Sequence, residues 1–168
     1  MKQRSFTALV FGGVLASATP ALAGPADNYI SKLDGNWRGG GVLTTPDGKK
    51  VKLRCATKNS LSDGQQRLSM NGRCASSQGK ASLRGRLRTT DDGAQFTSVS
   101  FTIAGRGRYS SARLNGNTLT LNGTGKVDGG RTVSLRSVIR GGGNRYSITL
   151  FDNDGGSWND RGTLTFRR

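Results

Sequence analysis

Apolar and cationic residues alternate in three segments of the stretch from Lys50 to Arg88. In each segment one set of alternate positions is mostly apolar: Val51, Leu53, Cys55, Leu68, Met70, Cys74, Ala81, Leu83 and Leu87. The intervening positions carry the cations: Lys50, Lys52, Arg54, Arg73, Lys80, Arg84, Arg86 and Arg88. A period of two is typical of β-strands with one buried face. The stretch therefore predicts neighbouring antiparallel strands with an apolar inside and a cationic outside.

Aspartate–glycine pairs separate the alternating segments along the chain. Six of the ten aspartates precede a glycine: Asp34, Asp47, Asp63, Asp92, Asp128 and Asp154. This pairing is typical of hairpin and bulged turns. Turn signals recur about every eight to twelve residues, and no long helical pattern lies between them. The sequence therefore predicts an all-β fold, an antiparallel meander of about 8–10 strands that forms a small barrel or, alternatively, a sandwich.

The first 23 residues have the pattern of a secretory signal peptide. An apolar run from Phe6 to Ala18 follows a short basic start, and Ala21-Leu22-Ala23 is a small-residue cleavage site. The run is too short to span a bilayer. Residues 24–168 have the size of one domain, and the segment from Pro25 to Leu33 predicts a short helical turn that plugs one barrel end. We therefore expect a periplasmic or secreted chain without a transmembrane anchor.

The two cysteines, Cys55 and Cys74, stand at inward positions of strands that we expect to be neighbours. In an oxidising compartment such a pair forms a disulfide. Closing a loop of this size stabilises a fold by about 3 kcal/mol in the chain-entropy model. The spacing is not that of a CxxC redox motif, and the chain has no histidine to complete a metal site. We therefore predict one structural disulfide.

The chain has few residue types that support catalysis. It contains no glutamate and no histidine, so the usual general bases, a serine triad and a zinc site are not available. Asp152, Asp154 and Asp160 resemble half of a calcium loop, but the completing glutamate is missing and a hairpin tip fits the sequence better. Trp158 and Asp160 could bind a small polar ligand at that rim. We predict a protein that is not an enzyme and uses no cofactor.

Net charge gives the strongest indication of function. The formal charge is +16, and the chain from residue 24 has 24 lysines and arginines against ten aspartates, or +14. The eight cations named above would converge on one surface, which attracts polyanions. We predict binding to anionic envelope polymers or lipid head groups, without specific nucleic-acid recognition because few aromatic residues interleave the arginines. The alternative is a basic surface that only keeps the protein in solution.

Two resemblances to known families concern larger parts of the chain. Gly35, Trp37 and a final arginine, Arg167 or Arg168, resemble the calycin pattern, in which a Gly-x-Trp motif opens the first strand and a late arginine packs on the tryptophan. This resemblance implies that Trp37 and Arg167 mark a barrel end or contact a ligand. Trp37-Arg38-Gly39-Gly40-Gly41, Leu53-Arg54-Cys55 and Arg73-Cys74-Ala75 resemble small exported alphaproteobacterial proteins of uncharacterised function.

Two other functions remain open at this point. A calycin-like carrier would hold a small apolar ligand inside the barrel near Trp37, although the inward residues are bulky enough to fill a small barrel. An inhibitor of a secreted hydrolase would use the disulfide-linked β scaffold. The strand order and the oligomeric state also remain open.

Overall fold

The computed structural model describes residues 23–103, 107–127 and 130–168, so the predicted signal peptide lies outside the described residues except for Ala23. One short helix precedes ten strands. In chain order they are α1 (Pro25–Ser31), β1 (Gly35–Thr44), β2 (Lys50–Ser62), β3 (Arg67–Ser76), β4 (Gly79–Thr89), β5 (Phe96–Ile103), β6 (Arg108–Asn115), β7 (Thr118–Lys126), β8 (Thr132–Gly142), β9 (Arg145–Asn153) and β10 (Asn159–Arg167).

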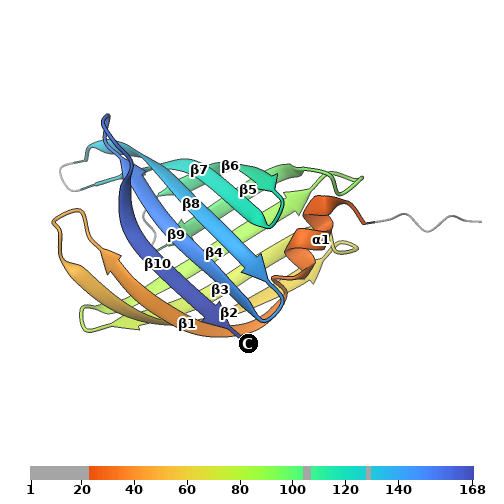
Figure 1. The fold of residues 1–168 in the computed structure, drawn as a ribbon, viewed down its shortest axis with the longest axis horizontal. Coiled ribbons are helices and arrows are strands. Elements are labelled where there is room, and N and C mark those ends of the chain that lie inside the picture. The colour runs from red at the N-terminus through yellow and green to blue at the C-terminus, as the bar shows by residue number, and fades with distance from the viewer. Residues whose placement is uncertain (1–22, 104–106, 128–129) are drawn as a thin grey trace, which may run out of the picture.

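The strands form one antiparallel sheet in the order β5-β4-β3-β2-β1-β10-β9-β8-β7-β6. Strands that follow each other in the sequence pair with each other, except β5 and β6, which are the two edges of the sheet; β1 pairs with β10 and so joins the two ends of the meander. The sheet curls until β5 and β6 lie against each other, with the rings of Phe101 and Tyr109 5.5 Å apart (Figure 1). The predicted all-β meander is therefore confirmed as a nearly closed barrel, and the sandwich alternative is wrong.

The turns use the predicted aspartate–glycine chemistry. Gly48, between β1 and β2, has φ +81°, which suits the residue after Asp47 in a tight turn. The hairpin between β2 and β3 has a short turn: β2 continues to Ser62, and residues 60–62 pair with β3. The reason is that alternation continues through Leu61, which packs against the core beside Leu68.

The helix α1 lies across one end of the barrel (Figure 1). Ile30 and Leu33 are fully buried, and the Tyr29 hydroxyl donates a hydrogen bond to the Ile139 carbonyl across the interior at 3.0 Å. The Leu33 carbonyl accepts hydrogen bonds from Trp37 Nε1 at 2.9 Å and from Asn59 Nδ2 at 2.7 Å. These contacts satisfy the polar groups at the end of the helix, and the predicted plug is confirmed.

The first strand approaches β10 too closely for side chains at two inward positions. A Cβ atom at Gly39 or at Gly41 would lie 1.9 Å from the carbonyl oxygen of Thr165 or Thr163. This close approach explains the alternate glycines beside Trp37 and lets β1 bend strongly where the two halves of the meander join.

Cys55 and Cys74 are direct cross-strand partners on β2 and β3 and form the predicted disulfide, with Cα atoms 4.0 Å apart. Both are buried in the core. A disulfide agrees with an oxidising compartment and hence with export. Within the described residues no helix is long and apolar enough to cross a bilayer.

Candidate functional site

The outer surface of β2–β4 carries the cations that the alternation predicts. All eight residues of the predicted set are exposed: Lys50, Lys52, Arg54, Arg73, Lys80, Arg84, Arg86 and Arg88. The register places Arg84 opposite Asn71 and Arg86 opposite Ser69. The predicted surface therefore exists, but its cations lie at different heights along the strands and form no single cluster.

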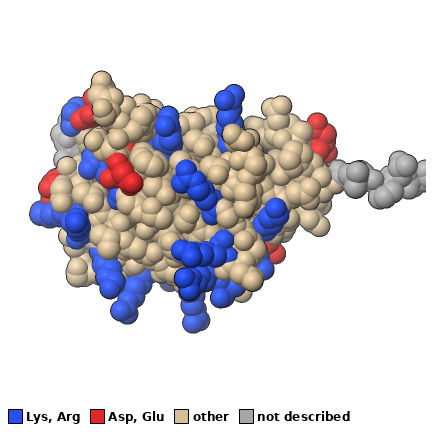
Figure 2. All heavy atoms as spheres, viewed as in Figure 1, with Lys and Arg blue, Asp and Glu red and all other residues tan. Residues whose placement is uncertain are grey.

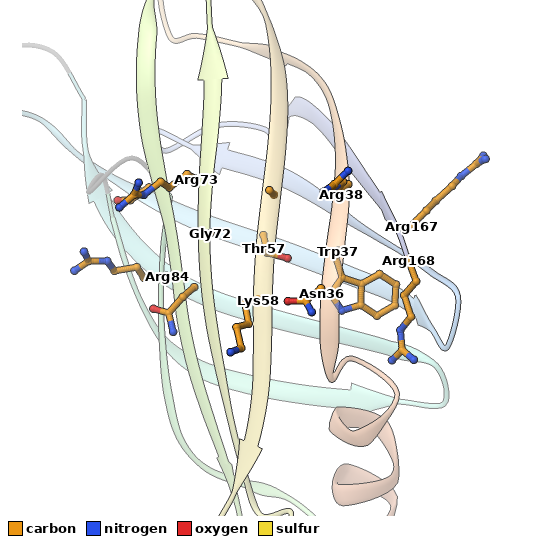
Figure 3. Close-up of a pocket in the computed structure, with 13 residues that line it drawn as sticks. Asn36, Trp37, Arg38, Thr57, Lys58, Gly72, Arg73, Arg84, Arg167 and Arg168 are labelled. Carbon is orange, nitrogen blue, oxygen red and sulfur yellow. The ribbon is translucent and has the colours of Figure 1, made fainter.

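A hollow of about 1040 Å³ lies on this outer side. We call it the basic hollow. Its lining residues come from β10 and β1–β4 and from the last residue of the chain: Asn36, Trp37, Arg38, Ala56, Thr57, Lys58, Asn71, Gly72, Arg73, Ser82, Arg84, Arg167 and Arg168. Figure 3 shows that Arg38 and Lys58 come from adjacent strands and that Arg73 and Arg84 lie farther along the sheet. Of the predicted set, the basic hollow takes in only Arg73 and Arg84.

The hollow forms where small side chains separate long ones. Ala56 on β2 lies between Arg38 on β1 and Arg73 on β3 in register, and Ser82 on β4 follows Arg73. The short side chains of Ala56 and Ser82 leave the sheet surface open between the arginines. The arginines therefore stand around a depression whose floor can be reached by a ligand.

Like charges face each other directly at the edge of the hollow. Arg38 pairs with Arg167 across β1–β10, and Arg167 pairs with Arg145 across β10–β9. Like charges directly opposite each other destabilise a sheet. Three arginines in successive strands are thus an arrangement that packing alone does not favour, and an anion held between them would relieve the repulsion.

Among the described residues, no aspartate side chain lines the basic hollow. The four ion pairs within the described residues lie elsewhere: Lys49–Asp47, Arg67–Asp63, Arg131–Asp154 and Arg161–Asp152. In Figure 2 the acidic side chains on the visible face lie toward the two ends of the molecule, and the charged side chains over its middle are basic. The cations of the hollow therefore have no carboxylate partner in the described part of the chain.

The two residues that the calycin resemblance singles out have different places. Trp37 is 1 % exposed and packs edge-on against Tyr146, with ring centroids 4.7 Å apart. Arg168 covers it, with its guanidinium carbon 4.7 Å from the Trp37 ring centroid and hydrogen bonds to the carbonyls of Lys32 and Asp34. Arg167 points away from the barrel (Figure 3). Trp37 is therefore a barrel-end residue, Arg168 is the arginine that packs on it, and Arg167 belongs to the basic hollow.

Sequence reasoning did not assign Arg38 or Lys58 to the site, and it named Arg168 only as an alternative to Arg167. The signal for Lys58 is present, because it continues the parity of Lys52 and Arg54, and Arg38 is outward because Trp37 is inward. Arg168 lies beyond the last strand, where alternation gives no direction. Asn36 and Asn71 lie beside Lys58 because the register of β1 and β3 with β2 pairs them with it, and the sequence alone does not give this register.

A buried polar cluster lies behind the hollow in the barrel interior. Thr57 and Tyr146 share a hydrogen bond of 3.3 Å between their hydroxyl groups, and Asn59 is 2 % exposed. Burial raises the pKa of Tyr146, and hydrogen bonds from Thr57 and Asn59 partly oppose the rise. The Asn59 Oδ1 atom has no hydrogen-bond partner among the residues that the structure describes. Asn59 Nδ2 donates a hydrogen bond to the Leu33 carbonyl and so connects this cluster to the segment that follows α1.

The hairpin between β9 and β10 is the tip that we expected in place of a calcium loop. The Asp152 carboxylate accepts hydrogen bonds from Arg161 Nε at 2.7 Å and from Asn159 Nδ2 at 3.2 Å. The Trp158 ring is stacked under Arg136 at 4.0 Å. Within the residues that the structure describes, no three potential metal-ligating side chains of His, Cys, Asp or Glu come together.

A second, smaller hollow of about 630 Å³ lies at the β4–β5 turn. Arg88 lines it together with Asp91 and Asp92. The Asp92 carboxylate accepts a hydrogen bond from Thr90, which lowers the pKa of Asp92. Because these carboxylates oppose the single cation, this hollow is a weaker anion site than the basic hollow.

No family model matches the chain, and no curated protein does either. Similar solved structures share the small β-barrel fold. The crystal structure of Rv2717c from M. tuberculosis aligns with TM-score 0.64 and 18 % identity over 87 % of this chain and 98 % of that chain. The S-type phycobiliprotein lyase CPES from Guillardia theta aligns with TM-score 0.51 and 10 % identity over 84 % and 92 %. The resemblance to exported alphaproteobacterial proteins stays a prediction.

Proposed function

We propose that this chain is a non-enzymatic binding protein of the cell envelope that takes anionic polymers in the basic hollow. The observation that carries the proposal is the lining itself. No aspartate side chain is among the described lining residues of this depression, and six cationic side chains surround it: Arg38, Lys58, Arg73, Arg84, Arg167 and Arg168. Guanidinium groups bind carboxylate, sulfate and phosphate oxygens in bidentate geometry, which suits polymers that carry these groups.

The shape of the site favours a polymer over a lipid surface. A planar bilayer meets the rim of a hollow, whereas a chain can enter it and reach the floor at Ala56 and Ser82. The large apolar side chains that the described surface exposes are Val42 and Trp158, and neither lines the hollow. Membrane-bound proteins usually add apolar anchors to their basic patches. Lipid head groups are therefore the alternative that the experiment must separate.

Heparin provides a convenient probe of polymer binding. The logarithm of the binding constant should fall linearly and steeply with the logarithm of the salt concentration, because each contact between a cation and the polymer releases counterions. The triple variant Arg38→Ser, Lys58→Ser and Arg84→Ser should weaken binding and lower the salt slope by about one per lost contact. The matched control Arg108→Ser, Arg113→Ser and Lys126→Ser removes the same charges from exposed positions on β6 and β7.

Three results would contradict the proposal: salt-insensitive binding, equal losses in the two triple variants, or no loss in the first. Vesicles that contain anionic lipid test the alternative. Stronger salt-dependent binding to such vesicles than to heparin, lost in the first triple variant, would assign the hollow to lipid head groups instead.

A carrier remains the second candidate because of one observation in the barrel interior. At the end opposite α1, the inward residues Leu43, Ile103, Leu135 and Leu150 are only half-buried, while Trp37 and Phe166 fill the α1 end. A small apolar ligand would therefore be restricted to the open half. Substituting Leu135 and Leu150 by Asp should abolish carriage of such a ligand and leave heparin binding unchanged.

A further inference from the structure

One row of outward residues continues beyond the basic hollow onto β9. Successive register pairs join Arg145 to Arg167, Arg167 to Arg38, Arg38 to Ala56, and Ala56 to Arg73. We call Arg145, Arg167, Arg38 and Arg73 the arginine row. Arg145 is exposed but lies outside the residues that line the hollow. The row therefore runs across the strands: β9, β10, β1 and β3 each contribute one arginine, and Ala56 stands at the position on β2.

Strand spacing fixes the length of this row. Adjacent strands lie about 4.8 Å apart, so the four steps from β9 to β3 span about 19 Å around the barrel. A compact anion inside the hollow would not reach Arg145. Directly opposed arginines repel each other from Arg145 through Arg167 to Arg38, and Arg145 is the member of this group that lies outside the hollow.

We infer that the ligand is a linear acidic polysaccharide that lies across the strands along the arginine row, from β3 to β9. This inference rests on the proposed function and adds the direction of the polymer and the role of Arg145. The row offers anion contacts one strand apart from Arg145 to Arg38 and two strands apart from Arg38 to Arg73, across Ala56, and successive charges of an extended chain can satisfy them together. Binding several linked charges raises affinity with chain length until the row is covered.

The side chains around the row favour a polysaccharide over a single-stranded nucleic acid. Base recognition requires exposed aromatic rings on which bases can stack. Trp37 is the one aromatic residue that lines the hollow, and it is 1 % exposed beneath Arg168. The neutral polar residues near the row, Asn36, Asn71 and Ser82, can instead hydrogen-bond to sugar hydroxyls.

Heparin oligosaccharides of two lengths test the inference with the chain purified after export. The short one fits within the hollow, and the long one exceeds the length of the row. Arg145→Ser should weaken binding of the long oligosaccharide about three- to fivefold and leave binding of the short one unchanged. Arg140→Ser, which removes an exposed arginine of β8 outside the row, is the matched control and should change neither affinity.

Each outcome has a defined meaning. Equal effects of Arg145→Ser on both lengths, no effect on the long one, or an equal effect of Arg140→Ser would overturn the inference. If these results occur while the triple variant Arg38→Ser, Lys58→Ser and Arg84→Ser still loses heparin, the proposed function stands and only the row is wrong. Length-dependent loss with single-stranded DNA but not with heparin would overturn the polysaccharide assignment. Loss of thermal stability in Arg145→Ser would identify a folding defect, and Arg145→Lys should then keep part of the length dependence.

Discussion

The inner and outer faces of β1–β4 use alternate residues of the same strands, yet their polar and charged groups differ in whether they have partners within the protein. On the inner face Trp37, Leu68, Met70 and Leu83 are almost fully buried, and the polar atoms near them form hydrogen bonds apart from Asn59 Oδ1. On the outer face the cations of the basic hollow lack carboxylate partners within the described residues. The inner face therefore stabilises the fold, and the cations of the outer face are free to bind a ligand.

The largest expected effect lies on the inner face. Trp37→Ala should lower the free energy of unfolding by about 3–5 kcal/mol, because it removes a large buried ring and its hydrogen bond to Leu33. Denaturant titration measures the change. Trp158→Ala is the control, since Trp158 is 37 % exposed and should cost about 1 kcal/mol or less. Similar costs for the two tryptophans would contradict the comparison.

Alkaline pH should unfold the barrel, because the buried tyrosines of the inner face ionise more readily in the unfolded chain. Burial raises the pKa of all three, Tyr29, Tyr109 and Tyr146. A raised pKa in the folded state means that the stabilisation is fully present below the unfolded value of about 10 and is lost as pH rises above it. The loss is about 1.4 kcal/mol per pH unit for each phenol. Tyrosinate absorbance should therefore appear together with unfolding, and its appearance in folded protein near pH 10 would show that the rings are accessible.

Loss of the disulfide should have the next largest effect. Substituting Cys55 and Cys74 together by Ala should lower the free energy of unfolding by about 3 kcal/mol. The folded variant should keep its affinity for heparin, because both cysteines are on the inner face. Equilibrium unfolding and a binding titration on the same preparation measure both quantities. A stable variant with lost affinity would reverse the roles of the two faces.

Outer-face variants should change affinity and leave stability nearly unaffected. Arg73→Ser with Arg84→Ser should weaken heparin binding about tenfold, with a change in unfolding free energy within about 0.5 kcal/mol. Arg86→Ser with Arg88→Ser removes equal charge from β4 outside the hollow and should have a smaller effect on affinity. Equal losses would favour the whole β2–β4 surface, as the sequence predicts, over the hollow.

The smallest expected effect is a gain in stability. Arg167→Thr relieves the repulsion with Arg38 and Arg145 and should raise the free energy of unfolding by about 0.5 kcal/mol or less. The gain should shrink with added salt, because salt screens exposed charges. Thermal unfolding at low and high salt measures it. A loss of stability in this variant would mean that Arg167 has a packing role.

The sequence predicted the fold to the extent that alternation and turn chemistry specify it. Alternation turned Cys55 and Cys74 inward and Arg84 outward, because inside and outside are decided within each strand. The hollow depends instead on register between strands that are far apart in sequence. Nothing local in the sequence places Arg38 opposite Arg167, since β1 and β10 meet only when the meander curls back on itself. Arg167 is exposed on the outer face, whereas Arg168 packs on Trp37. Alternation does not predict the direction of Arg168, because β10 ends at Arg167.

Amide chemical-shift mapping of the labelled chain during titration with heparin oligosaccharides tests the central claim most directly. We predict that the largest changes occur at Ala56, Asn71 and Ser82, which line the basic hollow. Changes confined to Leu43, Leu135 and Leu150 at the open half of the interior would contradict this location and favour the carrier.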